Sequence, residues 1–143
     1  MDKNHFNVIV IGAGISGIGA GYYLKKNCPN KSFCIIEGRE NIGGTWDLFK
    51  YPGIRSDSDM FTLGYAFKPW KEQKTIANGP SILSYLEETV EENNLREKIK
   101  FSHKVLSANW NSTKRKWEVR ASHHEREILF TANFLFMGTG YYN

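Results

Sequence analysis

The stretch Val8-Ile9-Val10-Ile11-Gly12-Ala13-Gly14-Ile15-Ser16-Gly17 decides the fold of this chain. An apolar run leads directly into a glycine-rich turn, which is typical of a buried strand followed by a helix. Gly12 permits the tight turn, Gly14 lets the backbone approach phosphate groups, and Gly17 lets the helix lie close to the strand. The segment therefore predicts a strand–turn–helix unit whose helix N-terminus binds the pyrophosphate of a dinucleotide.

A second predicted strand, residues 32–37, ends in a carboxylate at the spacing that this motif requires. Dinucleotide-binding units carry an Asp or Glu about 20 residues after the glycine turn, where it accepts hydrogen bonds from a ribose. Glu37 follows Gly17 by 20 residues (37 − 17 = 20). The alternative is an ordinary surface acid at a strand end, and the spacing favours the ribose role.

The remaining periodicity predicts one α/β domain over residues 1–143. Helices are expected over residues 14–27 and 81–93, parallel strands over 5–11, 32–37 and 99–102, and a buried final strand over 134–137. Three short runs, 105–110, 116–121 and 126–131, predict a three-stranded antiparallel meander. The segment 38–79 is irregular but rich in aromatic residues, which favours an ordered loop that helps to enclose a site.

Composition excludes several classes of function. The net charge of +4 is dispersed among acidic residues, which argues against nucleic-acid binding. No apolar run is long enough to span a membrane, and the N-terminal run lacks the features of a signal peptide. Cys28 and Cys34 are expected to be free thiols in a reducing compartment, so we expect a cytoplasmic protein. His123 and His124 are expected to form a solvated surface pair, and no Cys/His spacing predicts a metal site.

The order of these elements resembles the FAD-binding half of flavoproteins with two dinucleotide-binding domains. In that family the last turn returns the chain to the flavin dinucleotide, and Gly138-Thr139-Gly140 resembles its signature there. Gly43-Gly44-Thr45-Trp46 and Tyr51-Pro52-Gly53-Ile54-Arg55-Ser56-Asp57 are similar to two segments of Baeyer–Villiger monooxygenases, the class B flavin monooxygenases. Residues 43–60 and 64–70 look most like the subgroup of the mycobacterial ethionamide-activating monooxygenase. The departure from cyclic-ketone enzymes at Asp47-Leu48-Phe49 leaves ketone and sulfur oxidation both open.

The resemblance implies a Rossmann-like FAD-binding domain with a parallel sheet and the meander, truncated from a longer flavoprotein. The family's second glycine motif, for NADPH, and its F-x-G-x-x-x-H linker motif do not occur in the sequence. In the parent enzyme, NADPH bound by the missing domain would reduce FAD, and oxygen from O₂ would be transferred to a ketone or a thioether. We expect the 143-residue chain alone to be inactive.

The resemblance also assigns the candidate site residues. Those expected to contact the cofactor are Gly12, Gly14, Ile15, Ser16, Gly17, Glu37, Gly38, Arg39, Gly44, Thr45, Trp46, Val105, Thr139 and Gly140. Asp57 occupies the position of the family's aspartate near the flavin, which pairs with an arginine of the NADPH domain.

Other interpretations stay open for several of these residues and for the whole chain. Arg39 is either a ribose contact or a solvated side chain, and Trp46 either covers the flavin or fills the core. Asp57 is alternatively a turn residue after Pro52-Gly53. The chain as a whole is alternatively a non-catalytic flavin- or dinucleotide-binding module, or an NAD-binding dehydrogenase domain. The meander and the final glycine turn favour FAD over NAD.

Overall fold

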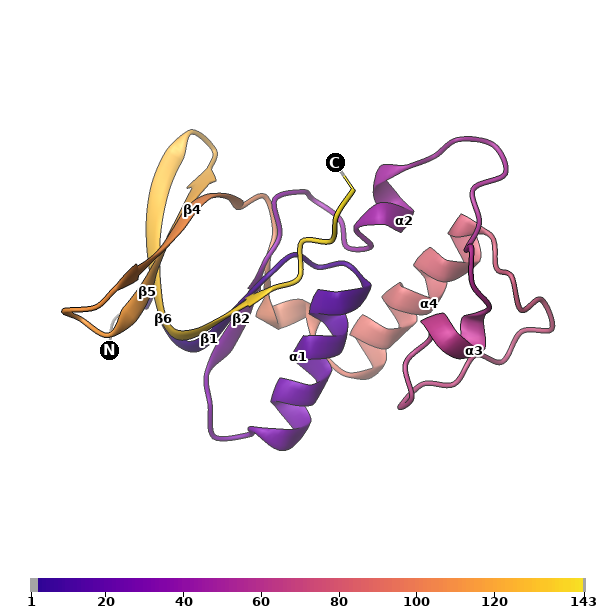
Figure 1. The fold of residues 1–143 in the computed structure, drawn as a ribbon, viewed down its shortest axis with the longest axis horizontal. Helices are drawn as coiled ribbons and strands as arrows, with labels where there is room; N and C mark the ends of the chain where they lie inside the picture. Colours follow the sequence, from indigo (N-terminus) through magenta and orange to yellow (C-terminus); the bar gives the residue numbers. More distant parts are fainter. Residues whose placement is uncertain (1–2, 143) are drawn as a thin grey trace.

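A six-stranded mixed sheet organises the chain in the computed structural model, which describes residues 3–142 (Figure 1). In sheet order the strands are β3 (Ile99–Lys100), β2 (Phe33–Ile36), β1 (His5–Ile11), β6 (Arg126–Met137), β5 (Lys116–His123) and β4 (Lys104–Asn111). The strands from β3 to β6 run parallel to one another, whereas β6, β5 and β4 pair antiparallel. The predicted α/β fold with a parallel sheet and a three-stranded meander is therefore confirmed.

Two long helices lie on the same side of the parallel strands. The helical segments are α1 (Ile15–Asn27), α2 (Thr45–Leu48), α3 (Met60–Leu63), α4 (Gly79–Glu92) and the 3₁₀ turn η1 (Arg96–Lys98). Helix α4 begins two residues before the predicted start because the Asn78 side chain caps it, accepting the Ser81 N–H at 2.8 Å. Helix α1 begins after Gly14, which serves as its N-cap.

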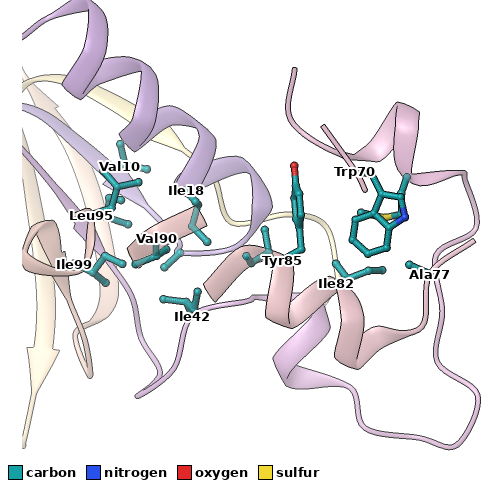
Figure 2. Packing of buried hydrophobic residues seen from close by; sticks show 14 of the residues in the cluster. Val10, Ile18, Ile42, Trp70, Ala77, Ile82, Tyr85, Val90, Leu95 and Ile99 are labelled. Atoms are coloured by element: carbon teal, nitrogen blue, oxygen red, sulfur yellow. The ribbon is translucent and has the colours of Figure 1, made fainter. Parts of the chain in front are cut away.

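The two faces of the sheet have separate hydrophobic cores. On one face, Val10 packs with Ile18 of α1 and Val90 of α4 (Figure 2). Ile35 of β2 and Leu86 of α4 belong to the same cluster. On the other face, the buried residues Ile9, Ile11, Cys34 and Ile36 share a cluster with Val119, Ala121, Phe130 and Ala132 of the meander. Helices thus cover one side of the parallel strands, and the meander covers the other.

The segment between β2 and α4 is ordered, as its aromatic content predicts, although it holds two short helices that we did not expect. Its backbone is tied together by the Ser56 N–H to Ala77 O bond (2.9 Å) and the Met60 N–H to Thr75 O bond (2.7 Å). Phe67 stacks on Tyr22 of α1, with ring centroids 3.5 Å apart. Tyr65, Phe67 and Trp70 pack against α1 and α4, whereas Tyr51 and Phe61 are exposed. These three packed rings fill the space beside the helices and, unlike Trp46, do not line the cleft described below.

The last predicted strand differs most from the structure. Residues 134–137 continue the third meander strand, because β6 pairs with β5 in its first half and with β1 in its second. They are also not buried: Phe134 is 69% and Met137 is 59% exposed. The physical reason is position: Phe134 lies opposite Val8 on the helix-bearing face and Met137 lies opposite Ile11 on the other face, and neither belongs to the core cluster of its face.

Three smaller predictions have mixed outcomes. The third parallel strand ends at Lys100 because Ser102 adopts a left-handed backbone (φ 56°), which turns the chain toward β4. His123 is not simply solvated: its ring stacks on His103 with centroids 4.0 Å apart. Cys28 and Cys34 are free thiols, and Cys34 is buried, as expected.

Candidate functional site

A cleft of about 330 Å³ lies where the carboxyl ends of β1, β2 and β6 meet. The chain after β6 passes over this edge between the start of α1 and α2 (Figure 1). The volume of the cleft falls within the range of small-molecule sites. Doubly wound folds bind nucleotides at this carboxyl edge of their parallel sheet.

The floor of the cleft is the glycine turn between β1 and α1. Gly12 has φ +97°, and a Cβ there would lie 2.5 Å from the Gly138 carbonyl oxygen. A Cβ on Gly17 would lie 1.7 Å from the Gly12 carbonyl oxygen, so only glycine lets α1 start this close to the strand. The first N–H groups of α1 have no acceptor within the helix, and they open toward the cleft as an anion-binding end.

Glu37 lies at the end of β2, and its carboxylate is held by two backbone donors. Oε2 accepts the Ala13 N–H at 2.8 Å, and Oε1 accepts the Arg39 N–H at 2.9 Å. The residue is only 8% exposed, and what is exposed faces the cleft. An ionised carboxylate has about four acceptor positions, so about two are left for the two hydroxyl groups of a ribose.

A second glycine pair forms the opposite wall. Gly43 and Gly44 have φ +114° and +52°, and the Gly43 N–H bonds to Ala13 O at 2.9 Å. A Cβ on Gly44 would lie 3.1 Å from the Gly14 Cα atom, so the two glycine turns face each other across a gap that a side chain would fill. Thr45 and Trp46 follow on α2 and line the same wall.

Arg39 and Asp47 join the end of β2 to α2. The Arg39 guanidinium donates to Gly44 O at 3.2 Å and forms an ion pair with the Asp47 carboxylate. Asp47 is 4% exposed, whereas Arg39 is half-buried and lines the cleft. Sequence reasoning missed Asp47, because its partner is eight residues earlier and only the fold of the loop brings the two together.

The turn between β3 and β4 contributes His103, and the first residues of β4 contribute Lys104 and Val105. Two backbone bonds draw this turn to the cleft: His103 N–H to Glu37 O and Ser102 N–H to Arg39 O, both at 2.9 Å. Burial lowers the pKa of His103, and this outweighs its hydrogen bond to the Phe101 carbonyl, which raises it. The sequence signalled Val105 only through the family resemblance and gave no signal for His103 or Lys104.

The last wall comes from the residues after β6. Thr139, Gly140 and Tyr142 line the cleft. The pKa of the Tyr142 hydroxyl is raised, mainly by its hydrogen bond to Tyr141, with a smaller effect from the negative charge of Asp57. Asp57 is exposed and does not line the cleft, although its charge reaches this rim.

The structure thus brings the predicted cofactor residues together, with Gly17 behind the turn as a packing residue and Asp57 outside the cleft. Trp46 lines the cleft and also packs against the helix-side core, so its place in the core is observed and its contact with the flavin stays a prediction. Arg39 is likewise no free surface residue. Within residues 3–142, no group of three metal-ligating side chains comes together, and no helix is long and apolar enough to cross a membrane.

Comparison with known proteins agrees with this geometry. Residues 10–72 match the family described as NAD(P)-binding Rossmann-like domain. The chain is 52% identical over 139 residues to the FAD-containing monooxygenase EthA of Mycolicibacterium smegmatis, covering 97% of this chain and 28% of EthA. It is 54% identical over 142 residues to the probable FAD-binding monooxygenase AlmA of an Acinetobacter species, covering 99% and 29% of the two chains. The chain is a homologue of the FAD-containing monooxygenases.

A solved structure supports the same relationship. The crystal structure of OTEMO in complex with FAD and NADP superimposes with a TM-score of 0.83 at 31% identity, over 94% of this chain and 26% of OTEMO. The resemblance to Baeyer–Villiger monooxygenases, and in particular to the ethionamide-activating subgroup, is therefore confirmed. This FAD-containing monooxygenase homologue spans 28–29% of the length of these two curated relatives.

Proposed function

We propose that this chain supplies the FAD-binding part of an NADPH- and O₂-dependent flavin monooxygenase that oxidises ketones or thioethers. The observation that carries the proposal is the cleft, in which Glu37 keeps acceptor positions for a ribose diol opposite the glycine cradle. The names of the relatives and the FAD in the OTEMO complex support the choice of FAD over NAD.

The residues of the cleft fit the parts of FAD in order. The first-turn amides of α1 and the cradle between Gly14 and Gly44 suit the pyrophosphate, and Glu37 suits the adenosine ribose. Trp46, Thr139 and Gly140 line the remaining wall, where they would shield the bound group from water. FAD, when bound, would supply the redox and oxygen chemistry, and the side chains of this chain bind, orient and enclose it.

The experiment is a titration of the 143-residue chain with FAD, followed by flavin fluorescence and by the melting temperature. Saturable binding of FAD, with no comparable effect of NAD, is the expected result. A rise in melting temperature with NAD and none with FAD would instead favour the NAD-binding dehydrogenase alternative. We also expect no flavin-dependent oxidation of NADPH by the chain alone, and saturable oxidation would show that it is more than a cofactor-binding module.

We further propose that Asp57 acts at the flavin rim of the whole enzyme and not in dinucleotide binding. Its exposure and the effect of its negative charge on the pKa of the rim residue Tyr142 support this. Asp57→Asn is therefore expected to leave the FAD dissociation constant and the melting temperature of this chain unchanged. A tenfold loss of FAD affinity would contradict the assignment.

The two free thiols support a reducing compartment, and we propose the cytoplasm.

A further inference from the structure

The ion pair between Arg39 and Asp47 places a neutralised arginine beside the ribose end of the cleft. The guanidinium is fixed from two sides, by the Asp47 carboxylate and by Gly44 O at 3.2 Å. Asp47 itself is 4% exposed and does not line the cleft, so it acts only through its partner. A second cation, Lys50 Nζ, lies 3.6 Å from the other Asp47 oxygen, but its side chain is 72% exposed.

An arginine near the carboxylate that binds the ribose has a specific chemical consequence. In dinucleotide-binding folds, an arginine at this end of the site accommodates the 2′-phosphate of NADP. Its planar fork suits two phosphate oxygens at once, which makes it a stronger anion site than a single ammonium group. A free Arg39 would therefore favour a 2′-phosphorylated ribose, which FAD lacks.

The proposed function, on which this inference rests, makes such discrimination necessary. The enzyme would use two dinucleotides, FAD with a free 2′-hydroxyl and NADPH with a 2′-phosphate. The cleft described here would have to accept the first and reject the second. Glu37 supplies part of the rejection by charge repulsion, but a mobile Arg39 two residues away would offset it.

We propose that Asp47 is the positioning residue that gives this cleft its preference for a dinucleotide without a 2′-phosphate. It holds the Arg39 fork against Gly44 O and cancels its charge, so that the fork is not available to a phosphate. The ribose then meets Glu37 as the dominant charge, which accepts hydroxyl donors and repels an anion.

The test measures how strongly each protein discriminates between ADP-ribose and its 2′-phosphate, two probes that occupy only the adenosine side of the cleft. Dissociation constants are measured by calorimetry for the unaltered chain and for Asp47→Asn, which keeps the shape of the side chain and removes its charge. Glu40→Gln is the matched control, because Glu40 is exposed and lies next to Arg39 in sequence. Its replacement changes the net charge by the same amount as Asp47→Asn does.

We expect Asp47→Asn to shift the ratio of the two dissociation constants at least tenfold toward the 2′-phosphate. The double variant Asp47→Asn/Arg39→Gln should lose that shift, because the gain comes from the released guanidinium. Glu40→Gln should leave the ratio unchanged. FAD affinity should fall only a few-fold in Asp47→Asn, because Glu37 and the glycine cradle are intact.

An unchanged ratio in Asp47→Asn, with FAD still bound, would overturn the inference and leave the proposed function standing. An equal loss of affinity for both probes would also overturn it, since that is the signature of a purely structural residue. Failure of the unaltered chain to bind FAD or ADP-ribose would overturn the proposed function, and this inference with it. If Asp47→Asn and the smaller Asp47→Ser both fail to fold, Arg39→Gln decides: it should not weaken the 2′-phosphate probe, and a tenfold weakening refutes a locked Arg39.

Discussion

Replacing Glu37 by Gln should both destabilise the chain and weaken FAD binding, because the carboxylate has two tasks. Its two oxygens accept the Ala13 and Arg39 N–H groups at 2.8 and 2.9 Å in a site that is 8% exposed. Glutamine has the same shape but offers one oxygen and one NH₂ group, so one backbone donor would face another donor. A buried donor without an acceptor costs about 1–3 kcal/mol. For a chain of this size we expect the melting temperature to fall by roughly 3–5 °C per kcal/mol.

The expected loss of FAD affinity follows from the second task of the same side chain. Hydrogen bonds to a charged group contribute about 1.5–3 kcal/mol. Glutamine loses the charge and one acceptor, so about one such bond is lost, which corresponds to about a ten- to hundredfold rise in the dissociation constant. The complete removal in Glu37→Ala should weaken FAD binding at least as much.

The assay combines flavin-fluorescence titration with thermal melting of Glu37→Gln, measured beside the exposed control Glu40→Gln. Both variants change the net charge equally, so a difference between them reports on position and not on charge. An FAD dissociation constant for Glu37→Gln equal to that of the control would refute the ribose role. A normal melting temperature combined with weak FAD binding would refute only the structural role of the two backbone bonds.

Three further predictions test the packing around the cleft. Gly17→Ala should lower the free energy of unfolding by about 3 kcal/mol or more, measured by denaturant titration, because its Cβ would lie 1.7 Å from Gly12 O. Burial lowers the pKa of His103, so as the pH falls this histidine takes up a proton more readily in the unfolded state than in the folded state. The melting temperature should therefore decrease as the pH is lowered from about 6.5, and it should decrease less in His103→Gln. Burial raises the pKa of Cys34 to about 12, so mass spectrometry after alkylation of the native chain should find Cys28 modified and Cys34 intact until unfolding.

The parts of the fold that depend on residues close together in the sequence were predictable from the sequence. The strand–turn–helix unit and Glu37 follow from local patterns, since glycine spacing, apolar runs and a strand-end acid act over about 30 residues. Strand β1 has the predicted bounds, and α1 ends at the predicted residue, Asn27. The cleft walls made by Thr139, Gly140 and Val105 were reached only through resemblance, because nothing local connects them to Gly12.

The residues that were missed belong to contacts between distant segments. Asp47 is buried and forms an ion pair with Arg39, which lies eight residues away in sequence. His103 and Lys104 reach the cleft because β2 continues into backbone bonds with the turn after β3. The burial predicted for Phe134 and Phe136 was wrong, because it also depends on contacts with distant segments. An apolar strand pattern indicates which face of a strand can be buried, but it does not show whether another segment packs on that face.

The glycines of the cleft serve the fold as well as the ligand. The Gly138 N–H bonds to Ile11 O at 2.8 Å, which brings the end of β6 against the turn after β1. A Cβ on Gly12 would then lie 2.5 Å from Gly138 O, and a Cβ on Gly138 would lie 3.2 Å from the Gly17 nitrogen. Three glycines from the two ends of the chain thus meet backbone to backbone, and a Cβ on any one of them would crowd the backbone of another. Gly14 differs, since a Cβ there would make only an ordinary 3.5 Å contact with Gly44 Cα while projecting into the cradle. At Gly12, Gly17 and Gly138 the need for glycine comes largely from the closure of the sheet, whereas at Gly14 we expect it to come from the bound dinucleotide.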